Sequence, residues 1–200
     1  MAFETVKKNL EENKFLVSTF ATAAEAADYL NGAIDGKTVG FGGSVTLQKM
    51  GLYELLSTHN EVFWHQVAAP EEKEAARMAE QTCQIFCTSV NGLAETGELV
   101  NIDATGNRVA ASIYGHEKVY FVIGRNKLAP TYEEALWRAR NIAAPQNAKR
   151  LNKKTPCAVK GDRCYNCKSA DRICRSLVVF WEASMGTEME VVLIDEDLGL

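Results

Sequence analysis

Four of the six cysteines in this chain lie close together near its C-terminal end. Cys157, Cys164, Cys167 and Cys174 fall within eighteen residues, in the stretch CAVKGDRCYNCKSADRIC, with the spacing C-x6-C-x2-C-x6-C. The central C-x2-C pair lets two thiolates of one tight turn reach the same ion, and the six-residue arms are long enough to bring in the outer two. The spacing therefore predicts a single metal centre held by four cysteines.

The chemistry of the four ligands narrows the choice of metal. Soft thiolates select an iron–sulfur cluster or zinc over hard cations. Zinc ribbons usually carry two C-x2-C knuckles, and this segment has only one. We therefore expect a [4Fe–4S] cluster first and zinc as the alternative, and reduced or redox-active thiols are the third interpretation.

The compartment decides whether cysteines are read as disulfides or as ligands. The N-terminal stretch MAFETVKKNLEENKF is charged and helix-like, without the apolar core of a secretory signal, and no apolar run reaches the roughly 20 residues that span a bilayer. We expect a cytoplasmic protein with reduced thiols and no membrane span. Disulfides are not required either, because 200 residues with 46% hydrophobic content can bury a large core.

Charge is unevenly distributed along the chain. The net charge is −4, yet the segment from Arg150 to Arg175 holds eight basic residues and two acids, a local charge of +6. Such a segment suits an anionic thiolate site, because nearby cations stabilise its charge. The alternatives are a solvated basic loop and an RNA-binding patch, but Tyr165 alone would supply aromatic stacking, so no nucleic-acid partner is expected.

A glycine-rich stretch, VGFGGSVT, is the second local signal. Gly42, Gly43, Ser44 and Thr46 follow a short apolar run and precede an amphipathic one. Backbone N–H groups and hydroxyls at a strand-to-helix turn can bind a phosphate or carboxylate. The stretch is neither G-x-G-x-x-G nor a P-loop, so neither dinucleotide binding nor NTP hydrolysis follows. The competing interpretation is a tight turn that needs glycine for its backbone angles alone.

The stretch NGLAETGELVNIDATGNR is rich in polar groups for a segment among apolar runs. Here Glu95 and Glu98 are candidates for a nucleophile or general base, Asp103 for a base or an orienting group, and Arg108 for an anion clamp. A plain hairpin with solvated carboxylates is the alternative.

Five other residues have side chains capable of chemistry. His116 and Lys127 flank an apolar strand and are further candidates, whereas His65 at a strand end is interpreted as a packed histidine. Cys83 and Cys87 have apolar neighbours and are interpreted as small buried hydrophobes. The sequence contains no recognisable Ser/His/Asp triad and no H-E-x-x-H motif.

The elements that must position these residues alternate in the first half of the chain. Strand and helix patterns in the order βαβαβα predict an α/β domain with a mainly parallel sheet. Thr22 and Glu25 have capping-box spacing, so a helix is expected over 23–34. The other expected elements of this half are a helix at 2–13, strands at 14–20 and 61–65, and a helix at 71–82.

The pattern changes after residue 83. Short β-like runs, CQIFCTSV, GELVNID and RVAASIY, predict hairpins or a meander, and the strongest strand is expected at 118–124. A helix should begin after Thr131 and stop by Pro145. Residues 145–175 are then expected to form a polar, cysteine-bearing excursion, after which the last two strands return to the sheet.

Several of these stretches together resemble one family. VGFGGSVTLQKMGL, ETGELVNIDATGNRVAASIYG, VIGRNKL, RARNIAAPQNAKRL and CYNCKSADRIC look like the LUD-domain family, also called the lactate-utilisation protein C or YkgG-like family. The resemblance covers nearly the whole chain in order, so residues 1–200 are expected to be one LUD domain. It implies a fold like the NagB/RpiA/CoA-transferase group and a link to bacterial oxidation of lactate, with iron–sulfur redox proteins as partners.

Two classes of function follow from the residues and the resemblance. The first is a component of a system that oxidises lactate or another 2-hydroxy acid and transfers electrons, binding a small anionic substrate and a metal centre held by the four cysteines. The second is a stand-alone enzyme of the CoA-transferase or isomerase kind, acting on a CoA thioester or a phosphorylated small molecule. In this second class Glu95 or Glu98 is catalytic and the metal is structural. Whether the chain is an enzyme by itself is left open.

Overall fold

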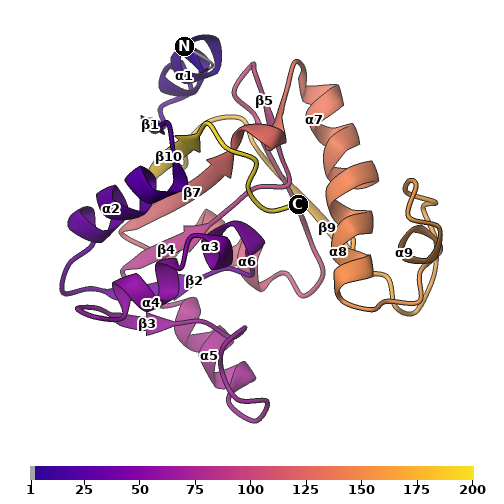
Figure 1. Ribbon diagram of the computed structural model, residues 1–200, viewed down its shortest axis with the longest axis horizontal. Coiled ribbons are helices and arrows are strands. Elements are labelled where there is room, and N and C mark those ends of the chain that lie inside the picture. The colour runs from indigo at the N-terminus through magenta and orange to yellow at the C-terminus, as the bar shows by residue number, and fades with distance from the viewer. Residues whose placement is uncertain (1–2) are drawn as a thin grey trace.

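The computed structural model describes residues 3–200, which form two β-sheets and the helices around them (Figure 1). The strands are β1 (Leu16–Phe20), β2 (Thr38–Phe41), β3 (Glu61–Phe63), β4 (Ile85–Thr88), β5 (Gly92–Ala94), β6 (Leu99–Asp103), β7 (Lys118–Gly124), β8 (Leu128–Ala129), β9 (Ser176–Phe180) and β10 (Glu188–Ile194). The helices are α1 (Glu4–Glu12), α2 (Ala23–Ala33), α3 (Val45–Lys49), α4 (Leu52–Leu56), α5 (Lys73–Glu80), α6 (Asn107–Ile113), the 3-10 turn η1 (Arg125–Lys127), α7 (Tyr132–Arg138), the π-helical turn η2 (Ala139–Ala143), α8 (Ala144–Arg150) and α9 (Pro156–Lys160).

The main sheet is parallel throughout, in the order β1-β10-β7-β4-β2-β3. The predicted α/β class and the βαβαβα order of the first half are therefore confirmed. β10, the last strand in the chain, lies between β1 and β7 in the sheet. Both β7 and β10 are buried on both faces, which explains their nearly continuous apolar sequences KVYFVIG and EMEVVLI.

The second sheet has the order β8-β5-β6-β9 and was not predicted. It is built on the antiparallel hairpin β5–β6, with β8 parallel to β5 and β9 antiparallel to β6. The expectation that both last strands return to one sheet is wrong for β9. Leu177 in β9 is half exposed while Phe180 is buried, so this strand suits a sheet edge with one face towards solvent.

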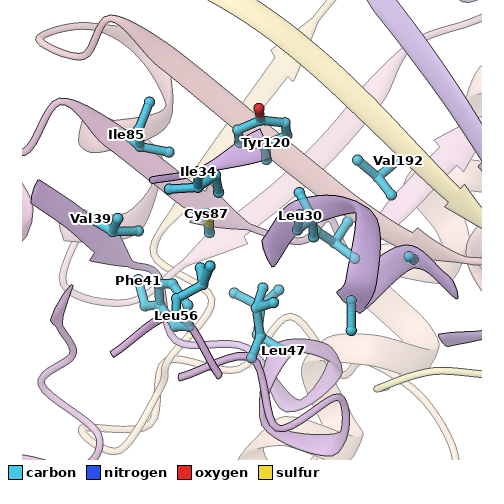
Figure 2. Close-up of a cluster of buried hydrophobic side chains, with 14 of the residues drawn as sticks. Leu30, Ile34, Val39, Phe41, Leu47, Leu56, Ile85, Cys87, Tyr120 and Val192 are labelled. Carbon is cyan, nitrogen blue, oxygen red and sulfur yellow. The ribbon is translucent and has the colours of Figure 1, made fainter. Parts of the chain in front are cut away.

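Three apolar clusters hold these layers together. In the first, α2, α3 and α4 pack on one face of the main sheet, and Figure 2 shows Leu30, Phe41 and Leu47 among its side chains. In the second, α1, α6 and the small sheet pack on the opposite face, and Phe121 is fully buried there. The third lies between the small sheet and the helix α7–η2, where Ala135 and Ala139 are buried as their helical spacing predicts.

Helix starts were predicted well where a side chain caps them. Thr22 and Glu25 form the predicted capping box at the start of α2. Thr131 accepts a hydrogen bond from the backbone N–H of Glu134 at the start of α7, as expected. In both places the hydroxyl satisfies a backbone donor that the first helical turn leaves free, so the signal is local.

The run RVAASIY is a helix, α6, and its prediction as a β-like run is wrong. Asp103 explains the difference, because its carboxylate accepts hydrogen bonds from the backbone N–H groups of Ala104, Gly106 and Val109. The bond from Val109 satisfies a donor in the first turn of the helix, and the other two fix the turn that precedes it. A tertiary packing face then outweighs the β-preference of valine and isoleucine, and Ala111 is fully buried against the second cluster.

The helix that begins after Thr131 does not stop at Pro145. It continues through η2 into α8 and ends at Arg150. The π-helical turn comes directly before the proline, where the wider turn relieves the clash that a proline ring makes with the preceding helical turn. The irregular cysteine-bearing segment therefore starts after Arg150 rather than at residue 145.

Candidate functional site

A cavity of about 570 Å³ lies at the carboxyl-terminal ends of four neighbouring strands of the main sheet. Residues 43–46 follow β2, residues 64–67 follow β3, residues 89–91 follow β4, and Lys127 follows β7. The small sheet and the helix η2–α8 supply much of the remaining wall. Parallel α/β sheets bind their ligands at this end, because the loops after the strands converge there.

Lys127 is the most unusual side chain of the cavity. It is 3% exposed, and its Nζ donates hydrogen bonds to Thr46 Oγ1 at 2.9 Å and to Ser89 Oγ at 2.7 Å. Burial lowers the pKa of Lys127 to about 7, and the charges of Arg138 and Arg108 act in the same direction. A buried amine without a carboxylate partner is poised to be neutral near physiological pH. The sequence alone marks Lys127 only as a further candidate.

His65 lines the same cavity and has a buried carboxylate behind it. Its Nδ1 lies 2.7 Å from Glu80 Oε1, and its backbone N–H donates to the same oxygen at 2.6 Å. Glu80 is fully buried at the end of α5. Since the carboxylate holds Nδ1, the imidazole is fixed in orientation and Nε2 is left for other partners. His65 is thus more than the packed histidine that we expected.

The His65–Glu80 pair depends on a glycine in the neighbouring strand. A Cβ on Gly40 would lie 2.8 Å from the backbone oxygen of Glu80 and 3.2 Å from the ring of Phe86. The absent side chain lets α5 approach β2 closely enough to put the carboxylate under His65. This pair was missed from sequence, although an acid in the last turn of a helix opposes the helix dipole and so signals a tertiary partner.

Asp103 and Arg108 both line the cavity, but their polar groups are largely engaged within the protein. Asp103 caps α6 and lies 3.6 Å from Arg108 Nε. Arg108 donates to the backbone oxygens of Ser89 and Ile102 and to the side chains of Asn91 and Asn101. Through these hydrogen bonds Arg108 links the loop after β4 to β6. To bind an anion as predicted, Arg108 would need the same guanidinium N–H groups that already donate to these protein acceptors.

The glycine loop lies beside the cavity, as its interpretation as a ligand loop requires. Gly43, Ser44 and Thr46 line it, whereas Gly42 does not. The side chain of Ser44 caps α3 by accepting from the N–H of Leu47, and Thr46 is a partner of Lys127. A Cβ on Gly42 would lie 2.8 Å from Arg108 Cγ, so this glycine leaves space for the Arg108 side chain. Neither Gly42 nor Gly43 has a positive φ, so Gly42 provides space rather than an unusual backbone angle. Ligand binding by the loop stays a prediction.

Glu95 and Glu98 lie in the turn of the β5–β6 hairpin and do not line the cavity. The hairpin reaches the cavity with its other end, at Asn91 and Ile102. Asn9 of α1 donates a hydrogen bond to the backbone oxygen of Glu95, and Glu98 accepts one from Thr96 within the turn. The two candidate catalytic glutamates are thus not among the residues that line the cavity.

The remaining candidates are packed in the interior. His116 stacks on Phe86 and its Nδ1 lies 2.6 Å from the backbone oxygen of Cys83, away from the cavity. Burial raises the pKa of Cys83 to about 12, and Figure 2 shows Cys87 among the apolar side chains of the first cluster. Both Cys83 and Cys87 are buried, as the interpretation of small hydrophobes requires.

The four clustered cysteines share a second, small cavity of about 10 Å³. Cys157, Cys164, Cys167 and Cys174 all line it, together with Arg140 and Arg172 and without an acid or a histidine. All six cysteines of the chain are free thiols. Among residues 3–200, however, no three metal-ligating side chains stand close enough to hold an ion as they are placed.

Polar groups contact two of the sulfurs, and for Cys164 they are hydrogen-bond donors. The Cys164 Sγ accepts from the backbone N–H of Asn166 at 3.3 Å, and Arg140 lies 3.9 Å away. The hydroxyl of Thr155 is 3.3 Å from Cys157 Sγ. Donors of this kind stabilise metal-bound thiolates. The donor set therefore suits a thiolate metal centre in composition and surroundings, although the four sulfurs as placed do not form a metal site.

The two cavities are neighbours. Ala144 at the start of α8 and Ile173 in the cysteine segment line both of them. The two cavities therefore share a boundary to which these two apolar residues contribute. In Figure 1 the cysteine segment and α9 lie on the outer side of the long helix that contains α7 and α8.

Comparison with known proteins identifies the family. The family model described as the LUD domain matches residues 3–194. The chain belongs to the LUD domain family. This family is associated with lactate utilisation, in agreement with the resemblance read from the sequence.

Other comparisons bear on the fold of this LUD domain. A crystal structure of a DUF162 family protein from Deinococcus radiodurans is similar, with a TM-score of 0.57 at 10% identity over 96% of each chain. At that identity the likeness concerns the fold alone. No curated protein matches the chain. Within residues 3–200, none of the helices has the length and apolarity needed to cross a membrane.

Proposed function

We propose that this LUD domain is a component of a system that oxidises lactate or a related 2-hydroxy acid. In this role the large cavity binds a small carboxylate, and the four clustered cysteines hold a redox-active metal centre. The observation that carries the proposal is the shared wall: Ala144 and Ile173 line both the cavity and the cysteine pocket. A ligand site and a redox centre that cooperate must lie this close.

The charge of the cavity favours an anionic ligand. Five basic side chains line it against two acids, and one of the acids, Asp103, is matched by Arg108. The basic residues are Lys73, Arg77, Arg108, Lys127 and Arg150, and the second acid is Glu54. A cavity lined mainly by one sign of charge concentrates ligands of the opposite sign. Hydroxyl and amide groups from Ser44, Gln66 and Asn91 would orient a small polar molecule there.

Cys157, Cys164, Cys167 and Cys174 are the residues that would hold the metal centre. A [4Fe–4S] cluster, when bound, supplies one-electron transfer, whereas zinc would stabilise the segment without redox chemistry. The absence of a second C-x2-C knuckle keeps the cluster ahead of zinc. The basic segment from Arg150 to Arg175 suits docking to an acidic partner, and iron–sulfur redox proteins are the partners that this role requires.

The alternative, a CoA-transferase or isomerase type of enzyme, receives less support from the geometry. It needs a carboxylate nucleophile at the ligand, and both Glu95 and Glu98 lie outside the cavity. Of the two acids at the cavity, Asp103 caps α6 and Glu54 lies on an exposed part of α4. The proposed role in lactate oxidation does not require a catalytic carboxylate at the cavity.

The metal is tested by anaerobic purification, followed by elemental analysis and a visible absorption spectrum. We expect iron and sulfide with a broad charge-transfer absorption, lost in a Cys167→Ser variant and retained in the control Cys83→Ala. Stoichiometric zinc in a colourless protein would make the centre structural. Four free thiols after anaerobic reconstitution would refute the metal centre.

The ligand and the pathway are tested separately. Calorimetric titration of the intact protein with lactate and with pyruvate should show saturable binding of at least one. Deletion of the gene in its source organism should abolish growth on lactate, with growth restored by the wild-type gene and not by the Cys167→Ser variant. Normal growth of the deletion strain on lactate would contradict the proposed system.

A further inference from the structure

Lys127 has an environment that the proposed function does not explain. Its Nζ is held by two hydroxyls, and no carboxylate among residues 3–200 forms an ion pair with it. The hydroxyl of Ser89 donates its own proton to the backbone oxygen of Val122 at 2.6 Å, so it can only accept from Nζ. A lysine that served to neutralise a carboxylate of the protein would have an acid beside it, and this one does not.

The side chains that bind Lys127 or shift its pKa are hydroxyls and cations. Thr46 comes from α3 and Ser89 from the loop after β4, while Arg108 of α6 and Arg138 of α7 contribute positive charge. The C-terminal tail also passes close by, since a Cβ on Gly199 would lie 3.2 Å from Nζ. Burial and these two cations lower the pKa of the amine to about 7, so a large fraction carries a free lone pair at neutral pH.

Lys118 shows the contrast. Its Nζ pairs with Glu188 at 2.8 Å and with Glu190 at 2.7 Å, and its pKa is raised, with these carboxylates opposing the effect of burial. Lys118 is therefore a protonated structural cation. Lys118 thus has carboxylate counter-ions, whereas the more deeply buried Lys127 has none among residues 3–200, and of these two lysines Lys127 lines the cavity.

We propose that Lys127 is an amine nucleophile that forms an imine with the carbonyl carbon of a small 2-oxo acid in the cavity. The proposal rests on the proposed function in one respect only, that the cavity receives a small carboxylate. An amine that is desolvated and placed near other cations is the usual form of a lysine activated for this chemistry. The basic lining binds the carboxylate of the ligand, and the carbonyl is the group that Lys127 attacks.

The reaction is balanced without an oxidant. The lone pair of Nζ forms a bond to the carbonyl carbon, and one Nζ proton is transferred to the carbonyl oxygen to give a carbinolamine. The hydroxyl takes a second proton, the carbon–oxygen bond breaks and the oxygen leaves as water, and Nζ loses its remaining proton as the C=N bond forms. Amine and ketone become imine and water. His65, fixed by Glu80 at the same cavity, is the titratable side chain suited to exchange these protons.

The test is reductive trapping on the intact protein. Pyruvate is added with sodium cyanoborohydride, which reduces imines in preference to ketones, and the product is located by intact mass and peptide mapping. We expect one covalent adduct, on Lys127, and none with lactate, which has no carbonyl at that carbon. Lys127→Met and Lys127→Arg should both lose the adduct. Lys49→Met, which removes an exposed lysine of α3 away from the cavity, should keep it.

Binding of pyruvate, measured by calorimetry on the same samples, separates the two proposals. Saturable binding without an adduct would overturn the imine and leave the carboxylate site standing. Neither binding nor adduct would overturn the ligand part of the proposed function as well. An adduct spread over several lysines, or one that persists in Lys127→Met, would also overturn the assignment. If Lys127→Met fails to fold, the charge-preserving Lys127→Arg variant is used instead, and an adduct that persists in it would overturn the assignment to Lys127.

Discussion

Lys127, which is buried, and His65, which is partly buried, both line the cavity, and their partners give them different properties. Lys127 has hydroxyls and nearby cations, so burial disfavours its charge. His65 has the carboxylate of Glu80, which fixes its ring. A buried group responds to the nearest partners because the low dielectric of the interior screens them little. The chemical properties of each side chain at this cavity therefore depend on its own nearest partners.

The lowered pKa of Lys127 predicts a pH dependence of stability. Below about pH 7 Lys127 is protonated in both the folded and the unfolded chain, whereas between about 7 and its ordinary value of 10.5 only the unfolded chain keeps the proton. The unfolded state then binds more protons, so this residue makes the free energy of unfolding rise with pH by up to about 1.4 kcal/mol per pH unit. Urea unfolding of wild type and Lys127→Met from pH 6 to 10 measures the difference.

The comparison of the two proteins isolates Lys127, because all other groups titrate in both. The difference in unfolding free energy, wild type minus Lys127→Met, should be flat below about pH 7 and rise above it. Lys49→Met should follow wild type over the whole range. A difference that does not change with pH would show that Lys127 keeps its ordinary pKa.

Removing the Glu80 side chain should lower the free energy of unfolding substantially. Glu80→Ala leaves the backbone N–H and Nδ1 of His65 without their acceptor in a partly buried place, so we expect the free energy of unfolding to fall by about 2–3 kcal/mol. Glu74→Ala on the same helix breaks only an exposed pair with Arg77 and should cost less than about 0.5 kcal/mol. Chemical unfolding of both variants gives the comparison, and equal losses would argue against a structural role for the Glu80 contacts.

At the scale of elements, close packing of helices on the sheet places the site. α5 contacts β2 through the space left by Gly40, and that contact carries Glu80 to His65. The long helix α7–η2–α8 reaches from the small sheet to the cysteine segment, and its π-helical turn allows it to continue past Pro145. Each of these features joins residues that are far apart in the chain.

A pair of glycine substitutions tests the packing of α5. Gly40→Ala would place a Cβ 2.8 Å from the backbone oxygen of Glu80, so α5 must shift, and we expect a loss of about 1–3 kcal/mol. Gly32→Ala is the matched control, because nothing lies within 4 Å of its Cβ on the exposed side of α2. There alanine should stabilise by about 0.5–1 kcal/mol. Thermal unfolding distinguishes the two, and a neutral Gly40→Ala would contradict the close approach.

At the scale of the whole molecule, the cysteine segment interrupts the chain between two parts of one sheet. The chain leaves the core after Arg150, passes the cysteines, and returns to place β10 between β1 and β7. The segment from 161 to 175 has neither helix nor strand, so it has little regular structure of its own. A bound metal would supply order that such a segment lacks.

Limited proteolysis should report on this arrangement. Trypsin cleaves after lysine and arginine, which are frequent between Lys153 and Arg175. The metal-loaded protein should resist cleavage there, and metal removal should expose the segment. The two fragments should nevertheless co-elute in size-exclusion chromatography under native conditions, because β10 pairs with strands on both sides.

The control for this experiment is the Cys167→Ser variant, which should be cleaved equally with and without chelator. Fragments that separate after cleavage would contradict the position of β10 between β1 and β7. Equal resistance of the loaded and stripped wild-type protein would show that the metal does not order the segment.

Local signals in the sequence determined much of the secondary structure. Capping side chains at Thr22 and Thr131 mark helix starts, and the apolar run from Lys118 to Gly124 is a strand at its predicted position. These features depend on contacts within a few residues, so they can be read along the chain. The spacing of the four cysteines predicts one metal centre, which stays a prediction; all four line one small cavity, because short arms limit how far the thiols can separate.

Tertiary structure alone decided which polar residues meet. Glu95 and Glu98 are prominent in the sequence but lie at the far end of their hairpin, while Glu80 and Lys127 reach the site from separate elements. The same holds for β9 and β10, which enter different sheets although they are neighbours in sequence. Such outcomes depend on contacts between residues tens of positions apart, and on the burial that these contacts create. The local sequence pattern does not show these long-range contacts or the burial that they create. Burial is the main cause of the lowered pKa of Lys127.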